Sequence, residues 1–162
     1  MKKVALAALP DPGFEAARKG EPPDGWSVSS RPGQLEYRAT VSDVNCASGK
    51  QCVVVERTKG EGRNGVGTAA VLLDATTHRG RKIRVTASVR VEGKDPGAKA
   101  FLVALTRLDA ADFAEAPGAS WKKVHVDVDV PAEADLILIG LSVTGAARGV
   151  IDDIDVSSAP SD

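Results

Sequence analysis

The chain has 162 residues and a mass of 16.8 kDa, which suits one domain of ordinary size with a buried core. Its 21 basic and 22 acidic residues nearly cancel, so no overall field favours nucleic acid or an anionic membrane as a partner. A composition of 43% hydrophobic and 27% charged residues is globular rather than disordered, and no apolar run is long enough to span a bilayer.

The first half of the chain begins with a short apolar run. MKKVALAALPD resembles a signal peptide, but its apolar part, 4–9, is shorter than the usual hydrophobic region, so we expect a first strand there. The stretch FEAARKG, 14–20, has the composition of one or two helical turns. Short runs rich in Val, Thr and Ala, separated by Gly and Pro, then predict strands over 26–30, 35–43, 51–57 and 66–73.

The second half contains the two most regular patterns. In RKIRVTASVRVEG, 81–93, and KKVHVDVDVP, 122–131, apolar and polar residues alternate strictly, which predicts strands with one buried and one wet face. Further strands are expected over 99–108, 135–143 and 149–157. The stretch DAADFAEAPG, 109–118, predicts a short helix that begins at Asp109 as N-cap and ends at Pro117-Gly118.

About ten short strands separated by turn signals predict an all-β fold, an antiparallel β-sandwich or jelly roll. We expect one such domain over 1–157. The ending SSAPSD has the composition of a linker, so 158–162 is expected to be a tail or the start of a linker.

No catalytic motif emerges from the sequence. The Gly-rich stretch 59–68 lacks the Gly-Lys-Ser/Thr ending and following helix of a phosphate-binding loop, which favours a hairpin loop. His78 and His125 have no second His or Cys at metal-ligand spacing, and Ser120 does not complete a nucleophile elbow. We therefore expect no enzyme activity. A hydrolase that uses acids on one sheet face is the weakest of the alternatives, because neighbouring strand residues point to opposite faces.

Cys46 and Cys52 flank the turn-forming stretch Ala47-Ser48-Gly49-Lys50 and are the only cysteines. A disulfide across such a short loop would stabilise the fold by roughly 2 kcal/mol. The alternative is a pair of reduced thiols. We favour the disulfide, which would place the protein in the periplasm or outside the cell.

Three acids lie in the last predicted strand, RGVIDDIDV. With Val150, Ile154 and Val156 pointing inward, Asp152 falls on the core-facing side, whereas Asp153 and Asp155 face water. A buried carboxylate must be paired, hydrogen-bonded or bound to metal, so Asp152 requires a partner.

Several stretches, in order, resemble the galactose-binding-like β-sandwiches of carbohydrate-binding modules. DPGFEAARKGEPPDGW resembles their opening Gly-Phe-Glu and Gly-Trp elements, SGKQCVVVE their Ser-Gly-Lys strand, and VIDDIDV their closing Asp-Asp strand. RGRKIRVTASVRVEG and ASWKKVHVDVDVP match further strands of the pattern, so the resemblance covers nearly the whole chain. It is similar to accessory domains that precede erythromycin-esterase-like, peptidase or regulator domains in bacterial proteins.

The resemblance implies a structural calcium that ties the opening segment to the closing strand. Carried over to this sequence, Glu15 and Asp152 are the side-chain ligands, and the Ser48–Lys50 turn adds a backbone carbonyl, that of Lys50. Carboxylates with loop carbonyls suit calcium better than zinc. Asp11-Pro12 stands where the pattern has Asn. The alternative is that backbone N–H groups or an Arg satisfy Asp152.

The resemblance also implies carbohydrate as ligand, and sugar rings stack on aromatic side chains. Trp26, Trp121 and Phe14 occupy structural positions of the pattern, which leaves Tyr37 and Phe113 as candidate ligand-facing rings. On the solvent-facing sides of the strands, the side chains expected to make polar contacts with a sugar are Arg84, Arg90, His125 and Asp127. The alternative is that these are solvated surface residues that bind no ligand.

Two functions follow from these features. The leading prediction is a monomeric, non-catalytic accessory module that binds carbohydrate. The alternative is a structural or protein-interaction domain that docks against a neighbouring domain and has no glycan site.

Overall fold

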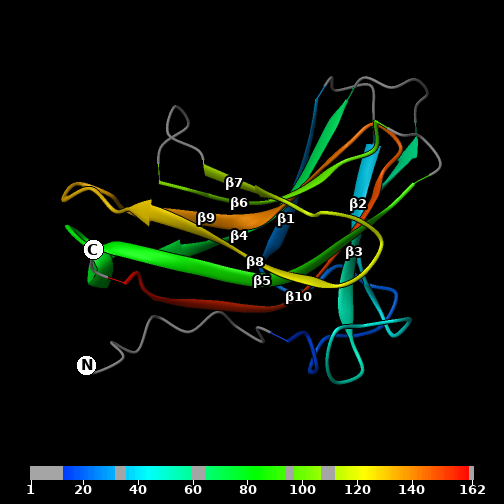
Figure 1. Cartoon of the computed structure of the whole chain (residues 1–162), viewed down its shortest axis with the longest axis horizontal. Coiled ribbons are helices and arrows are strands. Elements are labelled where there is room, and N and C mark those ends of the chain that lie inside the picture. Colours follow the sequence, from blue (N-terminus) through cyan, green and yellow to red (C-terminus); the bar gives the residue numbers. More distant parts are fainter. Residues whose placement is uncertain (1–12, 32–35, 60–64, 94–96, 107–111, 161–162) are drawn as a thin grey trace.

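A computed structural model describes residues 13–31, 36–59, 65–93, 97–106 and 112–160. Within these ranges, two five-stranded antiparallel sheets pack face to face as a β-sandwich (Figure 1), which confirms the predicted all-β fold. Sheet A has the strand order β1 (Trp26–Arg31), β4 (Val66–Asp74), β9 (Leu136–Thr144), β6 (Ala100–Leu105) and β7 (Asp112–Glu115). Sheet B has the order β2 (Glu36–Ser42), β3 (Cys52–Lys59), β10 (Arg148–Ser158), β5 (Lys82–Glu92) and β8 (Lys122–Asp129). A single 3₁₀ turn, η1 (Thr76–His78), precedes β5.

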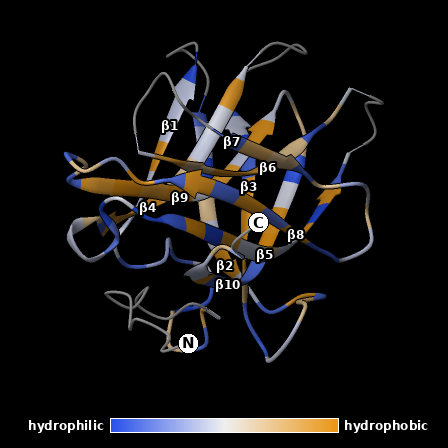
Figure 2. Cartoon of the chain, turned by 60° about the vertical axis from the view of Figure 1, so that its left-hand side comes forward, coloured by the Kyte–Doolittle hydropathy of each residue, from blue (hydrophilic) through white to orange (hydrophobic). Residues whose placement is uncertain are grey.

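The core lies between the two sheets and is built from the inward-facing residues of each strand. In β9, Ile137, Ile139, Leu141 and Val143 have no solvent exposure, and buried residues of sheet B such as Val53 and Val85 belong to the same core. Figure 2 shows hydrophobic residues along strands of both sheets. The alternation found in the sequence at 81–93 is therefore the alternation between core and outer face in β5.

The prediction of a helix over 109–118 is wrong for its described part. Residues Asp112–Glu115 form the edge strand β7, which pairs with β6 from Phe101↔Glu115 to Ala104↔Asp112. The rings of Phe101 and Phe113 meet edge to face on this pair, with centroids 6.1 Å apart. Cross-strand hydrogen bonds and this ring contact stabilise the strand more than an isolated helical turn would be stabilised, because such a turn is only marginally stable in water. The predicted N-cap Asp109 lies outside the described residues.

The N-terminal segment, residues 13–25, precedes β1 and has no α-helix within 14–20. Its residues form turns, in which the amide of Ala17 donates to the carbonyl of Phe14 over 3.2 Å. Phe14 has a φ of 60°, and this left-handed conformation interrupts a right-handed helix at its first residue. The predicted strand 4–9 lies outside the described residues. No described helix is long and apolar enough to cross a membrane.

Candidate functional site

The two cysteines form the predicted disulfide. Cys46 and Cys52 are bonded, with their Cα atoms 5.4 Å apart, and Cys52 is fully buried at the start of β3. The bond closes a loop, residues 46–52, that lies on the outer side of sheet B. This cysteine loop approaches both the N-terminal segment and the closing strand β10.

Asp152 is fully buried, as predicted, but it does not lie in the core between the sheets. Val150 packs on the outer side of sheet B with Cys52 and Val54, whereas Ile151 belongs to the main core. The expected inward orientation of Val150 is therefore wrong. A β-bulge between Asp152 and Asp155, with Asp153 at a φ of 49°, changes the alternation and returns Ile154 to the core.

The cysteine loop covers the Asp152 carboxylate. The backbone amides of Ala47 and Ser48 donate to Oδ2 over 3.1 and 3.2 Å, and the amide of Asp153 donates to Oδ1 over 2.8 Å. Burial raises the pKa of this carboxyl to about 6, although the three amide donors oppose the rise. The half-buried Asp153 accepts a hydrogen bond from the Ser48 hydroxyl, and Asp155 is exposed.

Glu15 meets the same loop from the other end of the chain. Its Oε1 accepts the amide of Lys50 over 2.7 Å and its Oε2 accepts the amide of Gln51 over 2.8 Å. Gly49 allows this approach, because a Cβ at that position would lie 2.3 Å from Oε1. Glu15 and Asp152, from opposite ends of the chain, therefore bind amides of the same loop.

The donor set does not fit the calcium site that the resemblance implies. Calcium binds six to eight oxygen atoms, including carbonyls. Here the loop turns N–H groups toward both carboxylates, and Lys50 contributes its amide to Glu15 rather than its carbonyl. Within the described residues, no group of three or more His, Cys, Asp or Glu side chains could hold a metal ion. The calcium site stays a prediction that rests on the resemblance alone.

Tyr37 does not face a ligand. Its side chain is 4% exposed and its hydroxyl donates to the carbonyl of Gly145 over 2.8 Å. The ring occupies the space above Gly67, where a Cβ would lie 2.1 Å from the ring. Tyr37 is therefore a core residue that joins β2 to the turn after β9.

Arg90 is also buried, contrary to its expected place on a wet face. It is 2% exposed, because Trp121 folds over it with the ring centroid 5.1 Å from the guanidinium carbon. Arg90 pairs with Glu92, and the Trp121 indole N–H donates to the carbonyl of Asn45 over 2.8 Å. The segment before β8 thus covers this part of sheet B, which the strand pattern alone did not indicate.

Arg84, Asp127 and His125 do lie on the outer face of sheet B. The guanidinium of Arg84 donates to both carboxylate oxygens of Asp127, over 2.8 and 2.9 Å, and these bonds hold the pKa of Asp127 below its usual range. His125 is exposed on the same strand as Asp127. Phe113, the remaining candidate, is 59% exposed on sheet A. The predicted ligand contacts therefore do not converge on one site.

The outer face of sheet A is formed by the side chains that point away from the core between the sheets. Strand register arranges its side chains in rows that cross the strands, and three of these rows lie next to one another. The middle row is Ser27, Ala70, Gly140, Val103 and Phe113. The hydroxyl row is Ser29, Thr68, Ser142, Phe101 and Glu115. The leucine row is Leu72, Leu138 and Leu105.

The middle row is low along most of its length. Gly140 has no side chain, and the Ala70 and Val103 side chains, which point away from the core, are only 5% and 1% exposed. Phe113 stands at the end of the low stretch as an exposed ring, supported by Phe101. The sequence suggested Phe113 but not the surface around it, because that surface combines five strands.

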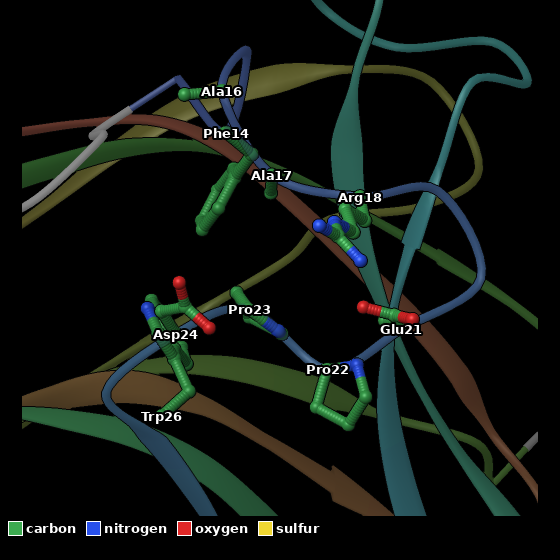
Figure 3. Close-up of a pocket in the computed structure, with 9 residues that line it drawn as sticks. All are labelled: Phe14, Ala16, Ala17, Arg18, Glu21, Pro22, Pro23, Asp24 and Trp26. Atoms are coloured by element: carbon green, nitrogen blue, oxygen red, sulfur yellow. The ribbon is translucent and has the colours of Figure 1, made fainter.

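A hollow of about 470 Å³ lies beside the N-terminal segment (Figure 3). Phe14, Asp24 and Trp26 lie on one side of it, and Arg18 and Glu21 lie on the other. The Phe14 and Trp26 rings meet edge to face with centroids 5.6 Å apart. Phe14 is buried and holds Trp26 in place, which agrees with the structural role expected for both rings.

No family model matches the sequence, and no curated protein matches it. Solved structures do. The chain is 19% identical to a family 61 carbohydrate-binding module in complex with β-1,4-galactotriose, over 93% of this chain and 97% of that one, with a TM-score of 0.61. The C-terminal family 22 module of Clostridium thermocellum Xyn10B is 13% identical over 91% and 90%, with a TM-score of 0.62. The xylan-binding domain CBM22-1 of Paenibacillus barcinonensis Xyn10C is 16% identical over 88% and 92%, with a TM-score of 0.56. The β-sandwich is thus the fold of carbohydrate-binding modules.

Proposed function

We propose that this domain is a non-catalytic module that binds carbohydrate on the outer face of sheet A. The observation that carries the proposal is the exposed ring of Phe113 at the end of a low row of small residues, flanked by hydroxyl groups. The fold likeness to carbohydrate-binding modules supports it.

The chemistry of the face suits a sugar chain. One face of a pyranose ring consists of C–H groups and packs on an aromatic ring such as that of Phe113, whose partner Phe101 fixes its orientation. The exposed side chains of Ser27, Ser29 and Glu115 supply donors and acceptors for sugar hydroxyls. Between Ser27 and Phe113 the middle row carries no side chain longer than that of Val103.

Calorimetric titration tests the proposal, with β-1,4-galacto-oligosaccharides and xylo-oligosaccharides as probes because the structural neighbours were solved with or named for such sugars. Phe113→Ala is expected to weaken binding at least about tenfold, which corresponds to about 1.4 kcal/mol. His125→Ala, on the outer face of sheet B, is the matched control and is expected to leave affinity unchanged. Binding that survives Phe113→Ala but not His125→Ala would place the site on the opposite sheet.

A second function is favoured by the aliphatic side of the same face. Leu72 is 54% exposed and Leu136 48%, and they lie in neighbouring positions of the register; exposed apolar side chains gathered on one surface mark interaction sites. This side suits docking against a neighbouring domain or a protein partner. Leu72→Asp would abolish such docking and leave glycan titrations unaffected, whereas Phe113→Ala would do the reverse.

The accessory role and the location belong to the same proposal. The disulfide supports an oxidising compartment, either the periplasm or the cell exterior, because reducing cytoplasm keeps such thiols apart. If the domain serves a neighbouring catalytic domain, its removal is expected to lower the activity of that catalytic domain on polymeric substrate. Activity on small soluble substrates is expected to be retained. A monomer is expected by light scattering.

A further inference from the structure

The cysteine loop, residues 46–52, is hydrogen-bonded to two separate parts of the chain. Its amides bind Glu15 of the N-terminal segment and Asp152 of the closing strand. The side-chain amide of Gln51 donates to the carbonyls of Phe14 and Ala17 over 2.7 and 2.8 Å. The disulfide keeps both ends of the loop at the start of β3.

The contacts have the polarity of an anion site rather than a cation site. Both oxygens of Glu15 and both oxygens of Asp152 accept backbone amides, and successive amides that point into one concavity form a nest that binds carboxylates. A cation between these acids would face N–H dipoles that repel it. The position of Gly49 favours the same arrangement, since its φ of 59° turns the loop and its missing Cβ leaves space for Glu15.

We infer that the oxidised cysteine loop, without a metal ion, joins the N-terminal segment to the closing strand and holds the segment that lines the hollow in Figure 3. The disulfide and the loop amides take the place that the family resemblance gives to calcium. Phe14 is the link to the hollow, because Gln51 holds its carbonyl and its ring packs on Trp26.

The consequence of reduction is local. Without the bond, the loop amides lose the fixed positions that match Glu15 and Asp152, and residues 14–17 lose their anchor at Gln51. The ladders of β4 with β9 and of β5 with β10 do not depend on the loop and keep their register. Reduction therefore loosens the N-terminal segment before the sandwich unfolds.

Thermal unfolding of the oxidised protein tests the inference. We expect no shift in Tm with EDTA or with added calcium chloride, and a fall of roughly 5 °C with a phosphine reductant, from the entropy of closing so short a loop. The double variant Cys46→Ala, Cys52→Ala is expected to show the same fall and no response to reductant. A lower Tm in EDTA, or a higher Tm in calcium, would overturn the inference.

Hydrogen exchange provides a local readout of the same claim. Glu15→Gln keeps the size of the side chain but places an NH₂ group against an amide donor, so exchange at Lys50 and Gln51 is expected to accelerate about tenfold or more. Exchange in β9 should stay unchanged. Glu21→Gln, an exposed acid of the same segment, is the control and is expected to change neither. Unchanged exchange at Lys50 and Gln51 in Glu15→Gln would contradict the contacts. None of these readouts depends on whether the domain binds carbohydrate.

Discussion

The substitution Tyr37→Phe tests whether Tyr37 stabilises the core rather than contacts a ligand. The Tyr37 hydroxyl is buried and donates to the carbonyl of Gly145 over 2.8 Å, across 108 residues of sequence. The substitution keeps the ring above Gly67 and removes only the oxygen, so the Gly145 carbonyl loses its donor in a site that water does not reach. The cost of such an unsatisfied group is about 1–3 kcal/mol.

For a domain of this length, each kcal/mol lowers Tm by about 2–4 °C, so Tyr37→Phe should melt about 2–12 °C below the wild type. The assay is urea denaturation followed by circular dichroism, with the thermal melt as a second measurement. An unchanged slope with a lower midpoint identifies a pure loss of stability. Glycan affinity should not change, because the ring lies inside the sandwich. Wild-type stability together with weakened glycan binding would refute this reasoning and restore Tyr37 as a ligand contact.

Two further predictions concern charged groups. Burial raises the pKa of Asp152 from 3.8 to about 6, so the folded state binds its proton more tightly than the unfolded chain does. Its contribution to the free energy of unfolding is therefore greatest at low pH and falls by about 3 kcal/mol as pH rises from about 4 through 6. Denaturation curves measured across this pH range test this, because Asp152→Asn should remove that pH dependence. Arg84→Ala should leave the urea midpoint almost unchanged at physiological salt, because Arg84 and Asp127 form a partly exposed surface pair that water and salt screen; a clear fall in the midpoint would contradict that description.

Local sequence patterns predicted the strands well where alternation is strict. β5 and β8 fall within the predicted stretches, because a period of two residues is a property of the strand itself. The same reasoning failed at 109–118, since the choice between a helical turn and β7 depends on the partner strand β6. The helix propensity of a few residues stabilises a turn by less than pairing with a neighbouring strand stabilises β7.

The site was less predictable than the fold. Tyr37 was predicted to contact a ligand because it is aromatic, and Arg90 because the strand alternation places it on an outer face. Both side chains are buried. Tyr37 is enclosed because Gly67, on another sheet, leaves a space for its ring, and Arg90 is enclosed because Trp121 crosses it. Neither Gly67 nor Trp121 is near its partner in sequence. Phe113 was identified from composition, but its low neighbours became visible only once the register of sheet A was known.

Local patterns in the sequence were enough to predict the alternation of the strands, the all-β class and the pair of cysteines that a short turn brings together. These are local properties, set by side-chain period and by the reach of a few residues. Long-range packing determined which outer faces are covered and what satisfies each buried charge. It placed Asp152 outside the main core and supplied backbone amides as its partners, because the loop that carries those amides lies about a hundred residues away along the chain.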